Sequence, residues 1–238
     1  MLTLFFVDNL PTNIGANYEF TNEDADHAIR VLRMKAGDIF ALSDGKGAWS
    51  HVKATDVGKK AMKVEVIETG FQESLDTHIT VIQAIPKGDR LKESIELITE
   101  SGADRIIIWS AHRSIGKSDK GIEKLVRTAR EASKQSRRYR IPEICGAISS
   151  KNIIDEISKS DLAIVFHESA LSKLSDIVNT PAKKILVIIG PEGGITDAEL
   201  ELFAGAGAKV ALLGRPILRS AHAGLAAVSA VNALLKVW

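Results

Sequence analysis

Hydrophobic and polar positions follow two different patterns along the chain, and the change falls near residue 72. Before it, short segments of β-type residues alternate with turn-like stretches such as SDGKG and DVGKK, and they cover residues 2–7, 38–43, 48–55 and 61–68. One helical pattern, from Asn22 to Met34, interrupts them, with Thr21 placed to cap its start. This part of the sequence predicts a small β-barrel or sandwich with one helix.

The second pattern begins after a polar linker at residues 70–77. Strands rich in Ile and Val are predicted at 79–85, 105–110, 162–167, 185–190 and 209–214. Amphipathic helices are predicted between and after them, at 90–100, 120–134, 152–158, 197–204 and 220–235. Strands that are apolar on both faces and alternate with helices predict a mostly parallel α/β sheet covered on both sides. We therefore expect two domains, at residues 1–72 and 73–238.

Composition narrows the class of protein without naming a partner. Of the 238 residues, 45% are hydrophobic and 26% are charged, which is typical of a globular chain, and the net charge of +1 neither demands nor excludes nucleic acid. The single cysteine, Cys145, excludes an internal disulfide and a multi-cysteine zinc site. The N-terminus lacks a signal-peptide pattern, and no apolar run approaches the roughly 20 residues of a membrane span. We expect a cytoplasmic protein with neither membrane nor metal partner.

A glycine-rich loop, Gly190 to Ile195, joins a predicted strand to a helix. It has neither the Walker pattern nor GxGxxG, and Glu192 would repel a phosphate. The next residues, Thr196 to Glu199, form a capping box at the helix start. The loop is therefore either a tight crossover without a ligand or one wall of a pocket, and an acidic side chain suits a positively charged ligand.

Two further loops follow predicted strands in the same way. Phe166-His167-Glu168-Ser169 comes after one strand, and Arg215 to Arg219 comes after another, with Ser220 placed to cap the last helix. Ligands bind at the carboxyl edge of open α/β sheets, so these loops are predicted to share a site with the glycine loop. A lone His-Glu pair such as His167-Glu168 is more often structural than catalytic.

Basic side chains gather in two places. In the first helix His27, Arg30 and Arg33 recur at steps of three, while Ala28, Val31 and Leu32 are expected to face inward. Residues 134–140 hold four cations and Tyr139, which is expected either to stack on an unpaired base or to pack. Each cluster is either a solvated face or a contact for RNA phosphates, and Arg113 and Lys117 in a nearby loop can add to it.

Five segments in order carry a family resemblance: HAIRVLR at 27–33, KGDR at 87–90, ESGA at 100–103, RRYRIPE at 137–143, and IGPEGG with LLGRPILR at 189–194 and 212–219. Together they resemble the SPOUT, or α/β-knot, methyltransferases, and most of all the RsmE family of uridine N3-methyltransferases of small-subunit ribosomal RNA. The resemblance implies a PUA-like RNA-binding β-barrel domain followed by a SPOUT α/β domain with a deep trefoil knot. It also implies S-adenosylmethionine as cofactor, a homodimer, and small-subunit ribosomal RNA or a ribosomal particle as partner.

The same resemblance distributes roles over the chain. It implies that the cofactor lies against Phe166, His167, Glu168, Ile189, Gly190, Glu192, Gly193, Gly194, Leu213, Gly214, Ile217 and Leu218. RNA contacts are expected from His27, Arg30, Arg33, Lys87, Arg113, Arg137, Arg138 and Arg140. Arg219 is expected to stabilise an anionic uracil through its fork of donors.

The sequence departs from the family at two points. The family usually reads LGPRILR followed by Thr-Glu-Thr, whereas this chain reads LGRPILR followed by Ser220-Ala221-His222. A glutamate is thus unavailable as base, and either His222 replaces it or no side-chain base is needed. The departure keeps two rivals open: a SPOUT enzyme that methylates another RNA nucleotide, and a knotted RNA-binding protein without catalysis.

Overall fold

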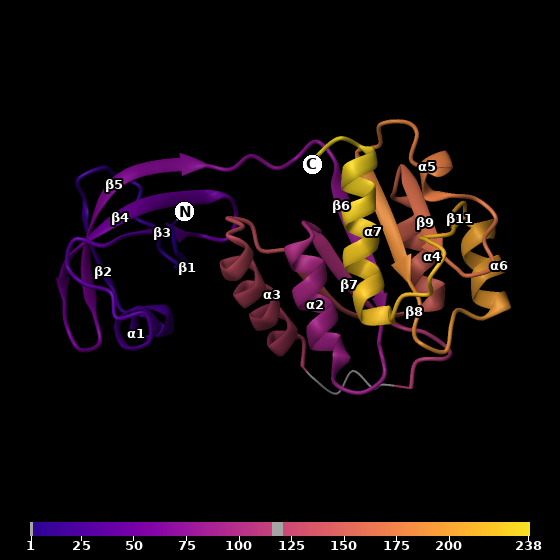
Figure 1. The fold of residues 1–238 in the computed structure, drawn as a ribbon, viewed down its shortest axis with the longest axis horizontal. Coiled ribbons are helices and arrows are strands. Elements are labelled where there is room, and N and C mark those ends of the chain that lie inside the picture. Colours follow the sequence, from indigo (N-terminus) through magenta and orange to yellow (C-terminus); the bar gives the residue numbers. More distant parts are fainter. Residues whose placement is uncertain (1, 116–120) are drawn as a thin grey trace. The chain divides into compact units, whose positions relative to one another are not determined.

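The computed structural model describes residues 2–115 and 121–238 and divides into two compact units (Figure 1). The first comprises Met1–Ser74 with Ser133–Ile141, and the second comprises Leu75–Ala132 with Pro142–Trp238. The units differ from the predicted contiguous domains because residues 133–141 belong with the N-terminal segment. The domain boundary itself stays a prediction.

The described residues of the first unit form one mixed sheet with one complete helix, and the end of helix α3 (Ile122–Ser136) also belongs to this unit. Its strands are β1 (Leu4–Phe6), β2 (Asn17–Phe20), β3 (Ile39–Ser43), β4 (Ala48–Val57) and β5 (Met62–Phe71), in the order β1-β3-β4-β5-β2. The β1–β3 pair is parallel and the other pairs are antiparallel. All five strands contribute buried side chains to one core, in which the rings of Phe5, Phe20 and Phe40 lie 5.5–5.7 Å apart. The sheet therefore curls around that core.

Helix α1 (Glu23–Arg30) is shorter than the pattern predicts, and it begins at a different cap. The side chain of Asn22, not of Thr21, accepts a hydrogen bond from Ala25 N. The helix ends at Arg30, so Val31 and Leu32 come after its last residue. They are 64% and 44% exposed. The expectation that these two residues face inward is wrong, whereas Ala28 is buried as expected.

The second unit is a six-stranded sheet; the sequence predicts its parallel arrangement but not its strand at Glu143–Ser149. Its strands are β6 (His78–Ala84), β7 (Arg105–Ser110), β8 (Glu143–Ser149), β9 (Leu162–Phe166), β10 (Lys184–Ile189) and β11 (Lys209–Ala211), in the order β11-β9-β10-β6-β7-β8. Every neighbouring pair is parallel. The chain runs outward from β6 to β8 and then returns to the other side, so the strand order reverses between β6 and β10. Such a reversal marks the usual ligand crevice of an open α/β sheet.

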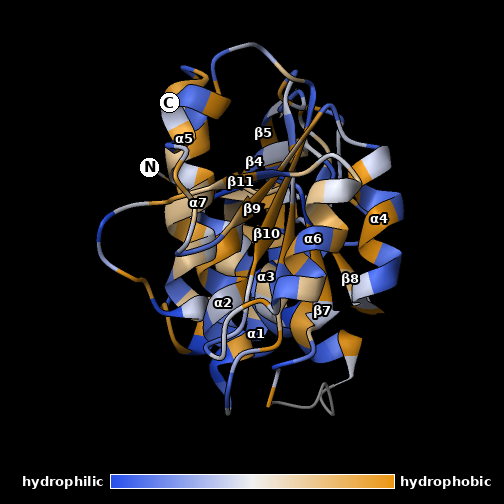
Figure 2. Cartoon of the chain, turned by 90° about the vertical axis from the view of Figure 1, so that its right-hand side faces the viewer, coloured by the Kyte–Doolittle hydropathy of each residue, from blue (hydrophilic) through white to orange (hydrophobic). Residues whose placement is uncertain are grey.

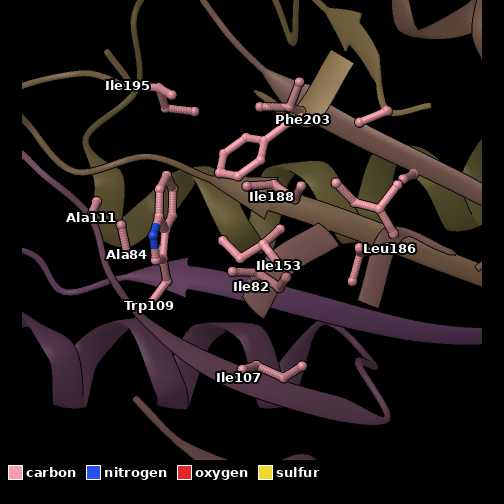
Figure 3. Close-up of a cluster of buried hydrophobic side chains, with 14 residues drawn as sticks. Ile82, Ala84, Ile107, Trp109, Ala111, Ile153, Leu186, Ile188, Ile195 and Phe203 are labelled. Atoms are coloured by element: carbon pink, nitrogen blue, oxygen red, sulfur yellow. The ribbon is translucent and has the colours of Figure 1, made fainter. Parts of the chain in front are cut away.

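Helices cover both faces of this sheet (Figure 2). They are α2 (Arg90–Glu100), α3 (Ile122–Ser136), α4 (Ser150–Ser158), the short α5 (Leu174–Ile177), α6 (Asp197–Gly205) and α7 (Ser220–Leu234). Helices α2 and α7 pack together on one face, and α4 and α6 pack together on the other. Under α4 and α6 lies a buried cluster in which Trp109 meets Phe203 edge to face at 5.4 Å (Figure 3). Because helices cover both faces of the sheet, the loops at the ends of its strands are the part of the sheet that can form a site.

Candidate functional site

The three loops predicted to share a site do meet at one edge of the sheet. They follow β9, β10 and β11, which are neighbours in the order β11-β9-β10 and run parallel. Their carboxyl ends therefore lie together, and the loop after β6 lies beside the glycine loop on the other side of β10. This arrangement puts the candidate site at the point where the strand order reverses.

Each of three glycines in the loop after β10 has a local structural reason. A Cβ on Gly190 would come within 2.7 Å of Ile195, and one on Gly193 would come within 3.0 Å of Arg113. Gly194 has a φ of +77°, which side chains rarely adopt. Arg113 also donates from Nη1 to the carbonyl of Gly193 at 3.1 Å. Arg113, predicted as an RNA contact, therefore braces the glycine loop from the β7 side.

Glu192 ties the glycine loop to the loop that follows β6. Its Oε2 accepts a hydrogen bond from the backbone N–H of Lys87 at 3.0 Å, and both residues are exposed. Because a carboxylate in this position adds negative charge to this edge of the sheet, it favours a cationic ligand over a phosphate.

The loops after β9 and β11 are joined by backbone hydrogen bonds. Phe166 pairs with Ala211 in the sheet, His167 N donates to the Ala211 carbonyl at 3.2 Å, and Leu212 N donates to the Ser172 carbonyl at 2.9 Å. The Nδ1 of His167 lies 2.7 Å from Ser169 Oγ, and Glu168 is exposed. This local contact is consistent with a structural role for His167.

The loop after β11 presents apolar side chains to solvent at the same edge. Ile217 and Leu218 are 79% and 42% exposed, and Gly214 is exposed beside half-buried Leu213. Exposed aliphatic groups next to polar backbone are typical of a surface that a ligand covers.

Ser220 has a role that sequence reasoning missed. The predicted cap is wrong, because Arg219 occupies the N-cap position of α7 and Ser220 is the first helical residue. Ser220 is buried, donates from Oγ to the Gly190 carbonyl at 2.7 Å and accepts from Gln83 Nε2 at 3.1 Å. The start of α7 is thus tied to the glycine loop and to β6.

We expect Ser220→Ala to lower the free energy of unfolding by about 1–2 kcal/mol, because it leaves the Gly190 carbonyl and the Gln83 amide without this partner. Backbone amides of the glycine loop should also exchange hydrogen faster. Urea denaturation and native-state hydrogen exchange measure the two effects, with Ser229→Ala on the same helix as control. Unaltered exchange in the glycine loop of Ser220→Ala would contradict this role.

Arg219 and His222, the predicted catalytic residues, lie at the start of α7 and are exposed. His222 Nε2 lies 3.1 Å from Oε1 of Glu93 on α2, and both side chains are 48% exposed. Glu93 had no signal in the sequence, because the pair joins helices far apart in the chain.

Glu199 holds the far side of the glycine loop. Its side chain is buried and accepts four hydrogen bonds. Oε1 accepts hydrogen bonds from His112 N at 2.9 Å and from Ser150 Oγ at 2.8 Å. Oε2 accepts hydrogen bonds from Thr196 N at 3.0 Å and from Thr196 Oγ1 at 2.8 Å. Burial alone would raise the pKa of this carboxyl, but the hydrogen bonds outweigh burial and lower the pKa below its ordinary value. The predicted capping box is confirmed, and it also anchors the loop after β7 and the start of α4.

The basic residues of α1 are exposed and lie near its C-terminal end. Arg30 forms an ion pair with Asp26 at 2.8 Å, and Arg33, with a φ of 54°, lies beyond the helix end. With His27 they surround the exposed Val31 and Leu32. This mixed basic and apolar surface is not a purely solvated charged face.

Three residues of the second basic cluster make side-chain contacts within the protein. Lys134 turns inward, and its Nζ lies 2.6 Å from Asp24 Oδ1, with both side chains nearly buried. Tyr139 packs, stacked on Trp49 at 5.6 Å, and Arg140 lies over the ring of Phe71 at 5.1 Å. Arg140 Nε also donates to the carbonyl of Gln72 at 2.9 Å.

Arg137 and Arg138 are the remaining cations of that cluster. Arg137 is exposed, with a φ of 57°, and Arg138 is half-buried. Lys117 lies outside the described residues. Within residues 2–115 and 121–238, no helix has the length and hydropathy needed to cross a membrane, and no cluster of His, Cys, Asp or Glu could hold a metal ion.

Comparison with known proteins gives matches over both units. A sequence profile of the RNA methyltransferase domain matches residues 73–232, and a profile of the RNA methyltransferase PUA domain matches residues 20–67. The chain is 33% identical to ribosomal RNA small subunit methyltransferase E of Mycobacterium tuberculosis, over 99% of this chain and 93% of that protein. It is 30% identical to the protein of the same name from Bacillus subtilis, over 97% and 93% of the two chains.

Solved structures with bound cofactor are similar too. Ribosomal RNA small subunit methyltransferase E from Neisseria gonorrhoeae, bound to S-adenosyl methionine, superposes with a TM-score of 0.87 at 25% identity over 98% of both chains. A structure from Legionella pneumophila in complex with the same cofactor gives 0.86 at 26% identity, again over 98% of both chains.

Proposed function

Because this chain belongs to the ribosomal RNA small subunit methyltransferase E family, we propose that it methylates N3 of one uridine in small-subunit (16S) ribosomal RNA. It is an S-adenosylmethionine-dependent ribosomal RNA methyltransferase with a PUA-like N-terminal domain and an α/β methyltransferase domain. The observation that carries the proposal is the site itself. Three loops from adjacent parallel strands meet where the strand order reverses, and Arg219 and His222 lie at the start of the helix that follows the third loop.

The residues at this edge fit S-adenosylmethionine. Two exposed carboxylates, Glu168 and Glu192, suit its positive charge, and the exposed side chains of Ile217 and Leu218 offer apolar surface to a ring system. We propose that the predicted cofactor residues of the three loops hold it. When bound, the cofactor supplies a sulfonium-linked methyl group, and the carbon–sulfur electron pair stays with sulfur after transfer.

The uracil must reach this edge unpaired. N3 lies on the pairing edge of the base and carries a proton, so the nucleotide has to be single-stranded or flipped out before reaction. We propose that Arg219 binds the anionic uracil through charge-assisted hydrogen bonds and that His222 accepts the N3 proton. Both side chains are exposed at the start of α7, which Ser220 ties to the Gly190 carbonyl of the glycine loop.

We propose that RNA phosphates bind the basic residues predicted for this role, with Arg137 and Arg138 among them. Replacing both with alanine should weaken RNA binding and flatten its salt dependence, because each lost phosphate contact lowers the slope by roughly 0.7–0.9. Fluorescence anisotropy at several salt concentrations measures that slope. The matched control is Lys59→Ala with Lys60→Ala, which removes the same charge from an exposed turn of the same unit. If the salt dependence of RNA binding had the same slope in the two variants, Arg137 and Arg138 would not contact RNA phosphates.

The family also motivates three structural proposals. We propose that the C-terminal part of the chain forms the trefoil knot, that the protein works as a homodimer in the cytoplasm, and that the substrate is either ribosomal RNA or an assembled particle. Leu234 at the end of α7 and Trp238 beyond the helix are 39% and 68% exposed, and they supply apolar surface for a second copy. Sedimentation equilibrium tests the dimer.

Two rivals remain, since Ser220-Ala221-His222 departs from the family pattern. One is methylation of another RNA nucleotide, and the other is RNA binding without catalysis. Incubation with labelled S-adenosylmethionine and small-subunit ribosomal RNA, free or assembled, followed by nucleoside analysis, separates them. We expect label in N3-methyluridine. Label in another nucleoside supports the first rival, and RNA binding without incorporation supports the second.

A further inference from the structure

We propose that Glu93 is a positioning residue that holds His222 as the proton acceptor of the methylation site. The proposal rests on the proposed function and adds a residue that neither the sequence pattern nor the family resemblance indicates. Its basis is the 3.1 Å contact between Glu93 Oε1 on α2 and His222 Nε2 on α7. Within the described part of the chain, this is the only polar contact that either side chain makes.

Both helices that carry the pair are anchored to the glycine loop. Ser220, two residues before His222, donates to the Gly190 carbonyl at 2.7 Å. Lys87, in the loop that leads into α2, donates its backbone N–H to Glu192 at 3.0 Å. Since α2 and α7 also pack against each other, the pair lies at the carboxyl edge of the sheet beside the candidate cofactor loops.

The contact fixes which imidazole nitrogen is available. A carboxylate facing Nε2 accepts a hydrogen bond from the Nε2–H group, so the neutral ring carries its hydrogen on Nε2 and its lone pair on Nδ1. At 48% exposure the ring is reachable by a base from solvent. Ala221, which stands where the family usually has glutamate, is 1% exposed, so the carboxylate at this end of α7 comes from α2 instead.

Glu93 also offsets an electrostatic cost. His222 lies in the first turn of α7, where backbone N–H groups disfavour a cation. In the proposed step the N3–H bond breaks, the proton moves to Nδ1, and the electron pair stays on N3, where it forms the bond to the incoming methyl carbon. The imidazolium is then paired with the Glu93 carboxylate until water takes the proton.

Single-turnover rates test the pair. With RNA and S-adenosylmethionine saturating, His222→Ala should lower the rate constant by about 100-fold and Glu93→Ala by about 10-fold. Because Glu93 acts through His222, the double variant should be no slower than His222→Ala alone. Binding constants for RNA and cofactor should stay within about twofold in all variants. Glu96→Ala, at a half-buried carboxylate of the same helix that is paired with Lys92 at 3.3 Å, is the matched control and should keep the wild-type rate.

A spectroscopic measurement does not depend on turnover. The ¹⁵N shifts of the His222 ring, assigned by difference from His222→Ala, should show the Nε2–H tautomer in the wild type and a mixture in Glu93→Ala. An unchanged tautomer in Glu93→Ala, or additive rate losses in the double variant, would overturn the proposal. Wild-type protein that binds but does not methylate ribosomal RNA would instead refute the proposed function, and the tautomer result would still decide the Glu93 contact.

Discussion

Replacing Arg219 with alanine is expected to lower kcat by about 100-fold or more, because the variant loses the donors that stabilise the developing negative charge on uracil. The affinity for S-adenosylmethionine should change by no more than about twofold, since Arg219 is placed to bind the base rather than the cofactor. Arg219→Lys should recover only a small part of the rate, because lysine keeps the charge but lacks the planar fork. Steady-state kinetics and calorimetric titration of the cofactor measure the two quantities.

The control for this prediction is Arg215→Ala in the same loop. Arg215 is exposed like Arg219 and carries the same charge, but it precedes the helix start by several residues. Its replacement should leave kcat nearly unaltered. If Arg219→Ala lost cofactor affinity and turnover together, Arg219 would belong to the cofactor pocket instead.

The largest effect on stability is expected from Glu199→Gln. The Glu199 carboxylate acts as the acceptor in all four of its hydrogen bonds, two at each oxygen. In glutamine one of these oxygens is replaced by an NH₂ group, which would face two of the donors. We expect the free energy of unfolding to fall by roughly 3 kcal/mol, which is the cost of burying donors without acceptors. Urea denaturation followed by tryptophan fluorescence measures it. Glu201→Gln, exposed on the same helix, is the control, and equal stability of the two variants would contradict this account.

The same carboxyl gives a pH dependence of known sign. Its pKa is lower in the folded protein than in the unfolded chain, because the hydrogen bonds from His112, Thr196 and Ser150 outweigh the effect of burial. Its contribution to stability is therefore complete above the unfolded pKa of about 4.3 and is lost as the pH falls through the folded value. The stability difference between wild type and Glu199→Gln should be constant near neutral pH and shrink below pH ~4. A difference that grows toward acid pH would contradict the assignment.

Much of the α/β sheet could be predicted from the pattern of the chain. Four buried strands, β6, β7, β9 and β10, are rich in Ile, Val and Leu, and such apolar side chains favour burial of both faces of the sheet. The bounds of α2 agree with the prediction at both ends. β8 was missed because its sequence, EICGAIS, lies at the sheet edge, where each of its seven residues is exposed or only half-buried. β2 and the four-residue α5 are too short and too exposed to leave a periodic signal.

The site could be predicted only in outline. The glycine loop and its two companions follow strands whose carboxyl ends must share an edge if the strands are parallel, and the sheet confirms this. The ties that shape the site are long-range: Ser220 to Gly190, Lys87 to Glu192, and His222 to Glu93. Such pairs follow from the strand order, which places β10 between β9 and β6 and has no signature in local sequence.

The most direct test of the central claim is a map of methylated uridines in small-subunit ribosomal RNA from cells with and without the gene. A methyl group on N3 blocks base pairing, so reverse transcription stops beside it. We predict one stop that disappears on deletion, returns with the wild-type gene and does not return with Arg219→Ala. Identical maps with and without the gene would contradict the proposed substrate.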